Sequence, residues 1–181
     1  MLKVWLFRLS VVFNILILGI VGIYVANPAL IAQQFMKQLR MTRIDMFANF
    51  PVTESDVVFL GDSITHVGHW NEMFPGISTR NRGIAGDTTT EVLGRLHQVT
   101  KGKPKAVFLM IGTNDLSHGP NDRQDSYRQY REILKGIKSS SPDTQLFVQS
   151  IFPREVKRRA EVEAFNAEIK TLSENMGLTY I

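Results

Sequence analysis

The sequence predicts an α/β domain in three layers, in which a parallel sheet lies between two layers of helices. Short apolar runs without a polar face recur from residue 56 onwards, as expected for strands that are buried on both faces. Segments with helical spacing of apolar residues separate these runs, and such alternation gives a parallel sheet with right-handed crossovers. The expected strands are 57–60, a short one ending near residue 81, 106–111, 146–151 and the start of a fifth at 178–181.

Three helices are expected between these strands. Thr88–Glu91 is a capping-box pattern that opens the first. The second lies near 122–139, and Gly177 fits the C′ position that ends the third. Their inward-facing residues at helical spacing are Val92, Leu93, Leu96 and Val99; Tyr127, Tyr130, Ile133, Leu134 and Ile137; and Val162, Phe165, Ile169, Leu172 and Met176.

Leu9–Ala26 is almost wholly apolar, with Ser10 and Asn14 as its polar interruptions. As a helix this run would span about 27 Å, close to the hydrocarbon thickness of a bilayer. We predict a single-pass membrane anchor. A cleaved signal peptide is an alternative, but the run is long and no clear small-x-small site follows it. A buried core helix is the third interpretation, and it should show a polar face.

The net charge of +4 belongs to the N-terminal arm. Residues 1–43 hold five basic residues and no acidic one, which leaves −1 for the rest of the chain. The globular part has no basic stripe, so we expect no nucleic-acid partner. Basic residues flank the apolar run on both sides, which weakens the charge rule for orientation. We expect the N-terminus to lie on the cytoplasmic side of the membrane and the α/β domain to be extracytoplasmic.

The chain thus divides into an anchor at 1–28, a juxtamembrane helical connector at 29–55 and the α/β domain at 56–181. The connector is expected to form a helix over 29–50 that leads to Pro51. Its basic side chains would face lipid headgroups, each worth about 1 kcal/mol near an anionic surface. The alternative is a solvated connector. The residues expected to pack on the domain edge are Ile44, Phe47 and Phe50.

The stretch Val57–Thr65 is the one around which the chain is organised. Its apolar run ends at Gly61, and Asp62 and Ser63 then suit the first turn of a helix, where side-chain oxygens meet unpaired N–H groups. A serine at such a turn stands at the carboxyl end of the sheet, where open α/β sheets bind ligands. Ser63 is therefore either a helix cap or a nucleophile.

Two further stretches favour the nucleophile. Residues 81–91 read Asn-Arg-Gly-Ile-Ala-Gly-Asp-Thr-Thr-Thr-Glu, and residues 107–116 read Val-Phe-Leu-Met-Ile-Gly-Thr-Asn-Asp-Leu. With Gly-Asp-Ser-Ile-Thr at 61–65, they resemble the first three blocks of the SGNH (GDSL-type) hydrolases. Residues 86–96 are especially similar to the platelet-activating-factor acetylhydrolase-like and lysophospholipase-like branch. The resemblance covers Asp56 to Ile181 and implies a flavodoxin-like fold with strand order 2-1-3-4-5, the last strand incomplete.

The resemblance also implies a serine esterase that acts through an acyl-enzyme. Ser63 would be the nucleophile, and the oxyanion hole would be the N–H of Ser63, the N–H of Gly86 and the side-chain amide of Asn114. These roles suit the residues, since glycine lets backbone approach a substrate and asparagine offers two uncharged donors. The acids expected to be structural, as caps and loop hydrogen bonds, are Asp62, Asp87 and Asp115.

The base is absent from its expected place. The family carries an Asp-x-x-His block beyond the fifth strand, and this sequence stops within that strand, so the triad Asp and His are missing. We expect a truncated, nearly inactive form of a longer hydrolase; a non-catalytic, membrane-anchored binding protein of the same fold is the alternative. The remaining histidines are expected to be bystanders: His66, His69 and His118 near the sheet rim, and His97 on the solvent face of a helix.

The sequence excludes some chemistry and leaves the substrate class broad. There is no cysteine, hence no disulfide or thiolate site, and no His/Asp/Glu cluster has metal-ligand spacing. We expect no cofactor and no metal. The substrate would be a small ester, and relatives act on lysophospholipids, acetylated sugars and other small esters. Trp70, Met73 and Phe74 would either line an acyl pocket or form a packed surface flap.

Overall fold

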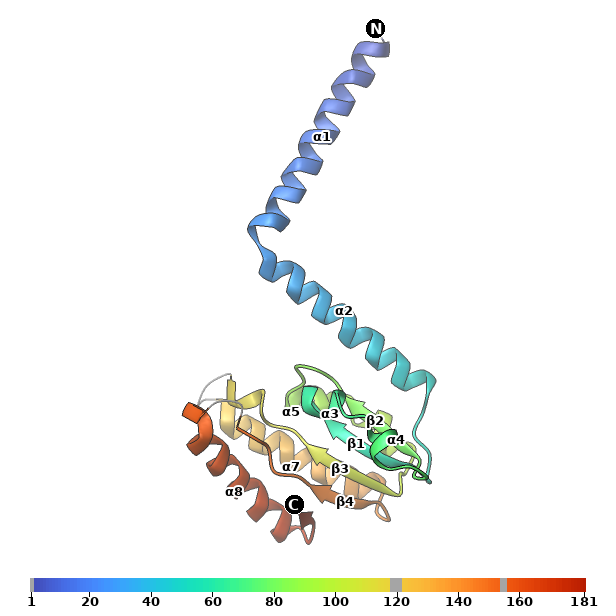
Figure 1. Cartoon of the computed structure of the whole chain (residues 1–181), viewed down its shortest axis with the longest axis vertical. Helices are drawn as coiled ribbons and strands as arrows, with labels where there is room; N and C mark the ends of the chain where they lie inside the picture. The colour runs from blue at the N-terminus through green and yellow to red at the C-terminus, as the bar shows by residue number, and fades with distance from the viewer. Residues whose placement is uncertain (1, 118–121, 154–155) are drawn as a thin grey trace. The chain divides into compact units, whose positions relative to one another are not determined.

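The computed structural model describes residues 2–117, 122–153 and 156–181 and contains two compact units. The first, residues 1–44, contains helix α1 (Leu2–Ala26) and most of helix α2 (Pro28–Asn49). Within α1, the segment Lys3–Ala26 is long and apolar enough to cross a membrane. The second unit, Asp45–Ile181, begins in the last turn of α2 and holds the α/β domain (Figure 1).

The domain is built on a five-stranded parallel sheet with the order β2-β1-β3-β4-β5, which confirms the predicted fold class. Strand β1 pairs with β2 on one side and with β3 on the other. The strands are β1 (Val57–Gly61), β2 (Thr79–Gly83), β3 (Ala106–Met110), β4 (Gln145–Val148) and β5 (Thr179–Tyr180).

The connections carry helices of very different length. The long ones are α7 (Asp122–Ser140) and α8 (Arg159–Asn175); the short ones are α3 (Ser63–His66), α4 (Trp70–Met73), α5 (Thr89–Gly94) and α6 (His97–Thr100), with 3₁₀ turns at Asp115–Ser117 and Val156–Arg158. The capping box at Thr88 and Glu91 is present. The first expected helix differs from the prediction because it is broken into α5 and α6. Gly94 weakens it at that point, and the next residue, Arg95, turns its side chain into the domain.

One face of the sheet carries the hydrophobic core. Side chains of β1, β3 and β4 at alternating positions meet the apolar sides of α5–α8. Burial on this face is nearly complete, so it supplies most of the hydrophobic stabilisation of the fold. The central members of the cluster are Val58, Leu60, Val107, Leu109, Leu146, Val148, Val92, Val99, Tyr130, Ile133, Ile137, Phe165 and Ile169.

The opposite face carries a row of stacked aromatic rings. Phe59 of β1 stacks on Phe108 of β3 with centroids 5.1 Å apart, and Phe108 stacks on Phe147 of β4 at 4.5 Å. Trp70 of α4 lies flat on Phe59 at 3.9 Å. Phe59 is thereby buried, while Phe108 and Phe147 remain partly exposed. The two faces of the sheet are therefore covered to different extents among the described residues.

Asp56 joins the amino-terminal ends of β1 and β2. Its buried carboxylate accepts hydrogen bonds from the hydroxyl of Ser78 at 2.6 Å, from the N–H and hydroxyl of Thr53, and from Nε of Arg80 at 3.0 Å. Burial alone would raise the pKa of Asp56, but these hydrogen bonds outweigh it and hold the pKa below its ordinary value.

The substitution Asp56→Asn is expected to lower the free energy of unfolding at pH 7 by about 2–3 kcal/mol, because it weakens several charge-assisted hydrogen bonds. A carboxyl whose pKa is lowered by folding stabilises the protein above its unfolded pKa of about 3.9, and this contribution is lost as the pH falls through the folded value. The difference between wild type and variant in urea unfolding should therefore shrink below about pH 4. The exposed Asp143→Asn is the control; an equal effect from it would contradict the assignment.

Candidate functional site

Three strands end side by side within the three sequence blocks. Gly61, the last residue of β1, is in register with Gly83 at the end of β2 and with Met110 at the end of β3. Ser63 follows the first strand closely, and Gly86 and Asn114 follow the other two. The fold thus brings the loops of all three predicted site residues to the carboxyl edge of the sheet, after the three neighbouring strands β2, β1 and β3.

The turn that carries Ser63 is tightly constrained. A Cβ on Gly61 would lie 2.3 Å from both the carbonyl oxygen of Met110 and Oγ1 of Thr65, so only glycine fits there. Asp62 is 1% exposed, and its carboxylate accepts the N–H of Ile64 at 2.9 Å. Asp62, rather than Ser63, is the cap of α3. The structure therefore gives the capping role to the neighbour of Ser63.

The second loop is fixed by a buried ion pair. Gly86 is exposed and has a φ of +85°, a conformation that strains any residue with a Cβ. The next residue, Asp87, is fully buried and accepts Nε of Arg95 at 2.7 Å. Arg95 also donates through Nη2 to the carbonyl oxygens of Gly61 at 3.2 Å and Arg82 at 2.9 Å. One guanidinium thus holds the ends of β1 and β2 and the loop beside Gly86.

The third loop is joined to the second by two side chains. Nδ2 of Asn114 donates to the carbonyl oxygen of Asp87 at 2.8 Å. The buried carboxylate of Asp115 accepts the N–H of Thr89 at 3.1 Å and also its hydroxyl. The amide of Asn114 is therefore directed at the loop that contains Gly86. The three acids of the blocks act as caps and loop ties, as their positions in the sequence predict.

Arg95 is the residue that sequence reasoning missed. It lies inside a segment read as one amphipathic helix, between Leu93 and Leu96, where an arginine suggests a solvated face. In the structure it is 3% exposed. The signal that could have located it is Asp87 in the preceding loop, because a buried carboxylate needs a cationic or hydrogen-bonding partner.

The histidines occupy different surroundings. His66 is the last residue of α3, and its N–H donates to the carbonyl oxygen of Asp62 at 2.9 Å. His69 is largely exposed, and its Nδ1 lies 3.4 Å from Oε1 of Glu72. His97 is exposed on α6, as predicted. His118 lies outside the described residues.

The segment from Trp70 to Phe74 packs on the sheet. Trp70 donates its ring N–H to the carbonyl oxygen of Thr65 at 3.0 Å, and Phe74 stacks on Phe59 with centroids 5.7 Å apart. Met73 is 60% exposed. These contacts favour the packed flap over a lining for an acyl pocket.

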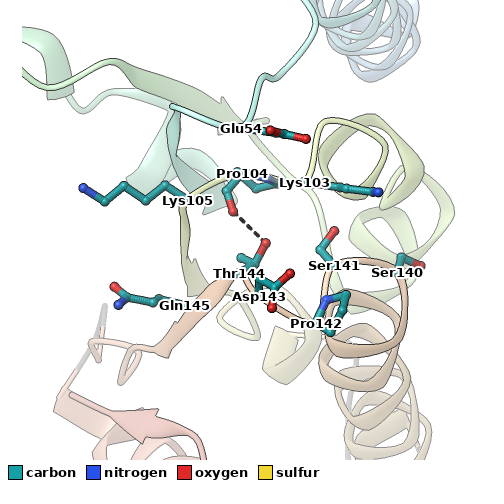
Figure 2. Close-up of a pocket in the computed structure, with 10 residues that line it drawn as sticks. All are labelled: Glu54, Lys103, Pro104, Lys105, Ser140, Ser141, Pro142, Asp143, Thr144 and Gln145. Atoms are coloured by element: carbon teal, nitrogen blue, oxygen red, sulfur yellow. Dashed lines mark hydrogen bonds between the residues drawn. The ribbon is translucent and has the colours of Figure 1, made fainter.

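Two cavities lie at opposite edges of the sheet. One of about 470 Å³ lies between the turns that precede β3 and β4, where Thr144 donates its hydroxyl to the carbonyl oxygen of Pro104 at 2.6 Å (Figure 2). It is at the amino-terminal edge and is separate from the predicted site. The other, of about 260 Å³, is polar and lies beside the second and third blocks. It is lined by Thr88, Thr90, Glu91, Asp115, Asp125, Ser126 and Gln129. Over the described ranges, no three His, Asp or Glu side chains are grouped to hold a metal ion.

Comparisons with known proteins find matches to this chain in a family model and in curated sequences. Residues 59–181 match the model of the GDSL-like lipase/acylhydrolase family. Over 107 residues the chain is 32% identical to platelet-activating factor acetylhydrolase IB subunit alpha1 of Rattus norvegicus and to subunit alpha2 of Homo sapiens. Each match covers 56% of this chain and 45% of the relative, so the chain spans about half the length of these curated relatives.

Solved structures share the fold at lower identity. A structure from Streptococcus pneumonia superimposes with a TM-score of 0.74 at 22% identity, over 86% of this chain and 80% of that chain. A GDSL-like lipase from Bacteroides thetaiotaomicron gives a TM-score of 0.57 at 23% identity, over 71% of this chain and 68% of its own. At these identities the likeness concerns the fold.

The substitution Asp87→Asn is expected to lower the free energy of unfolding by about 3–5 kcal/mol, because it leaves the guanidinium of Arg95 buried without its charged partner. Urea unfolding measures this change. The exposed pair of Lys135 and Glu132 is the control, and Glu132→Gln should cost less than about 1 kcal/mol. Equal, small effects of both substitutions would show that the buried pair does not hold the loops.

Proposed function

The chain belongs to the GDSL-like lipase/acylhydrolase family, and we propose that it is the scaffold of a serine esterase of SGNH type that cleaves small carboxylic esters through an acyl-enzyme. Ser63 is the proposed nucleophile. The proposed oxyanion donors are the N–H groups of Ser63 and Gly86 and the side-chain amide of Asn114. Acetyl and other short acyl esters, lysophospholipids and acetylated sugars are the proposed substrate classes.

The observation that carries this proposal is the contact between the second and third loops. Acyl transfer requires several donors to converge on one developing oxyanion. The amide of Asn114 is held against the carbonyl oxygen of Asp87, the neighbour of Gly86. Ser63 follows Gly61, whose carbonyl oxygen shares Arg95 with Asp87. A binding protein without catalysis gives no reason for these residue types to meet at one edge.

The test compares wild type with Ser63→Ala and Asn114→Ala, using a fluorophosphonate probe and short p-nitrophenyl esters. Any labelling and turnover should be lost in Ser63→Ala, since the hydroxyl forms the covalent bond. Asn114→Ala should lower kcat by about 10²–10³-fold and change KM little, because an oxyanion donor acts mainly in the transition state.

If the gene encodes residues beyond Ile181, the longer chain is measured beside the 181-residue chain, since general-base help contributes about 10²–10⁴-fold. His66→Gln and His69→Gln are added to whichever chain is active, to identify a histidine that takes the proton of Ser63. If neither chain is labelled or turns over ester, the non-catalytic binding protein replaces the esterase.

We further propose that Leu9–Ala26 is a single-pass membrane anchor and that the domain is extracytoplasmic. In support, the helix that contains this run is long and apolar enough to span a bilayer, and its apolar side chains are exposed. An exposed apolar surface of this size is costly in water. The basic side chains of Lys37, Arg40 and Arg43 would contribute contacts with lipid headgroups.

The full chain is expected to fractionate with membranes and to remain there through high salt and carbonate washing. Removing residues 1–28 should release it, with at most a weak, salt-sensitive association left from residues 37–43, because screening weakens exposed charge contacts. Immunoblotting of the fractions measures this. A full chain in the soluble fraction at its uncut mass would contradict the anchor, and a shortened chain there would indicate a cleaved signal peptide.

A further inference from the structure

The last turn of α2 is part of the α/β domain. Phe47 lies in this turn and is 1% exposed, whereas Phe50, one turn further on, is 60% exposed. Phe47 belongs to the same compact unit as the sheet. Burial of an aromatic ring at this depth stabilises the domain, and it raises the question of what the ring touches.

Phe47 touches two buried arginines. The guanidinium carbon of Arg82 lies 4.5 Å from the centroid of the ring, and that of Arg95 lies 5.7 Å from it. Both arginines are 3% exposed. Arg82 also donates through Nη2 to the carbonyl oxygen of Phe50. Cation–π contacts are stronger when the cation is removed from water, so the ring constrains both guanidinium groups.

These arginines are connected by hydrogen bonds to the turns of the candidate site. Arg95 forms an ion pair with Asp87 and also donates to the carbonyl oxygens of Gly61 and Arg82. Gly61 stands two residues before Ser63, and Asp87 follows Gly86. A short series of contacts therefore runs from the ring of Phe47 through Arg95 to the turns that carry Ser63 and Gly86.

We propose that Phe47 is a positioning residue: its ring fixes the planes of the guanidinium groups of Arg82 and Arg95. It thereby holds the segment 84–90, the loop after β2 and the start of α5, in the geometry of the candidate site. The charge of Asp87 keeps Arg95 near the loop, but an ion pair alone does not fix the plane of the guanidinium. Its two carbonyl contacts require that plane, because the donors of arginine form a rigid fork. The catalytic consequence rests on the proposed function; the effect on the loop does not.

Hydrogen exchange of the full chain tests the loop directly. Phe47→Leu keeps an apolar side chain but removes the ring face, and the control Phe50→Ala keeps the backbone carbonyl that Arg82 contacts. In Phe47→Leu, amides of 84–90 should exchange about thirtyfold faster, the scale of one desolvated cation–π contact. Exchange in α8 should not change. Phe50→Ala should match wild type, and Phe47→Tyr, which keeps a ring, should remain close to it.

Two results would overturn the proposal. One is unchanged exchange at 84–90 in a folded Phe47→Leu protein. The other is a uniform rise of exchange across the domain, which would make the role of Phe47 one of general stability. If Phe47→Leu does not fold, Arg82→Lys decides the matter, since it removes the planar group that contacts the ring. It should loosen 84–90 selectively, and a wild-type exchange pattern in this variant would overturn the proposal.

Ester turnover adds a second readout. Where wild type shows turnover that depends on Ser63, Phe47→Leu should lower kcat several-fold and leave KM nearly unchanged, because misplaced donors weaken the transition state more than the ground state. Wild-type kcat in this variant would contradict the catalytic consequence. If wild type itself shows no such turnover, the proposed esterase function fails, and the exchange measurement still decides the positioning role.

Discussion

The buried ion pair between Arg95 and Asp87 is the interaction on which the carboxyl edge of the sheet depends. Burying two charges is costly unless their remaining donors and acceptors are also satisfied. Arg95 offsets much of this cost by donating to two backbone carbonyl oxygens, at Gly61 and Arg82, in addition to the carboxylate. The ends of β1 and β2 and the loop after β2 are therefore held by one planar group. Asn114 joins the loop after β3 to the loop after β2 by donating to the backbone carbonyl of Asp87.

The parallel sheet was predictable from local patterns, and its strand order from the resemblance to the SGNH hydrolases. Apolar runs such as 106–111 identify buried strands, and their alternation with helices restricts the topology. The break between α5 and α6 was not predictable in this way. It depends on Arg95, whose burial is decided by Asp87 and by carbonyl groups distant in sequence. The uneven cover of the sheet is also a property of packing, because Phe108 and Phe147 belong to strands that look buried on both faces.

The candidate site was predictable as a set of loops, since the blocks around Ser63, Gly86 and Asn114 each follow a strand. The sequence also predicted the structural use of the neighbouring acids. What it could not provide is the direction of the amide of Asn114, which is set by a hydrogen bond across 27 positions of the chain. Nor could it distinguish the cap of α3 from the candidate nucleophile. Asp62 and Ser63 are both good capping residues, and the geometry of the turn alone assigns the cap to Asp62.

The connector and the α/β domain are not separable at the first strand. A lone phenylalanine in a helix with mixed faces carries no periodic signal, so sequence reasoning could place Phe47 only at the edge of the domain. The structure puts its ring against the same arginines that hold the loops after β1 and β2. The end of α2 thus packs against the buried arginines of the domain. A buried guanidinium needs an apolar contact on its planar face as well as hydrogen-bond acceptors at its edge. Water at that face would otherwise compete with its carbonyl partners. The ring of Phe47 supplies this apolar contact, so the geometry of the candidate site depends on a residue that precedes the first strand.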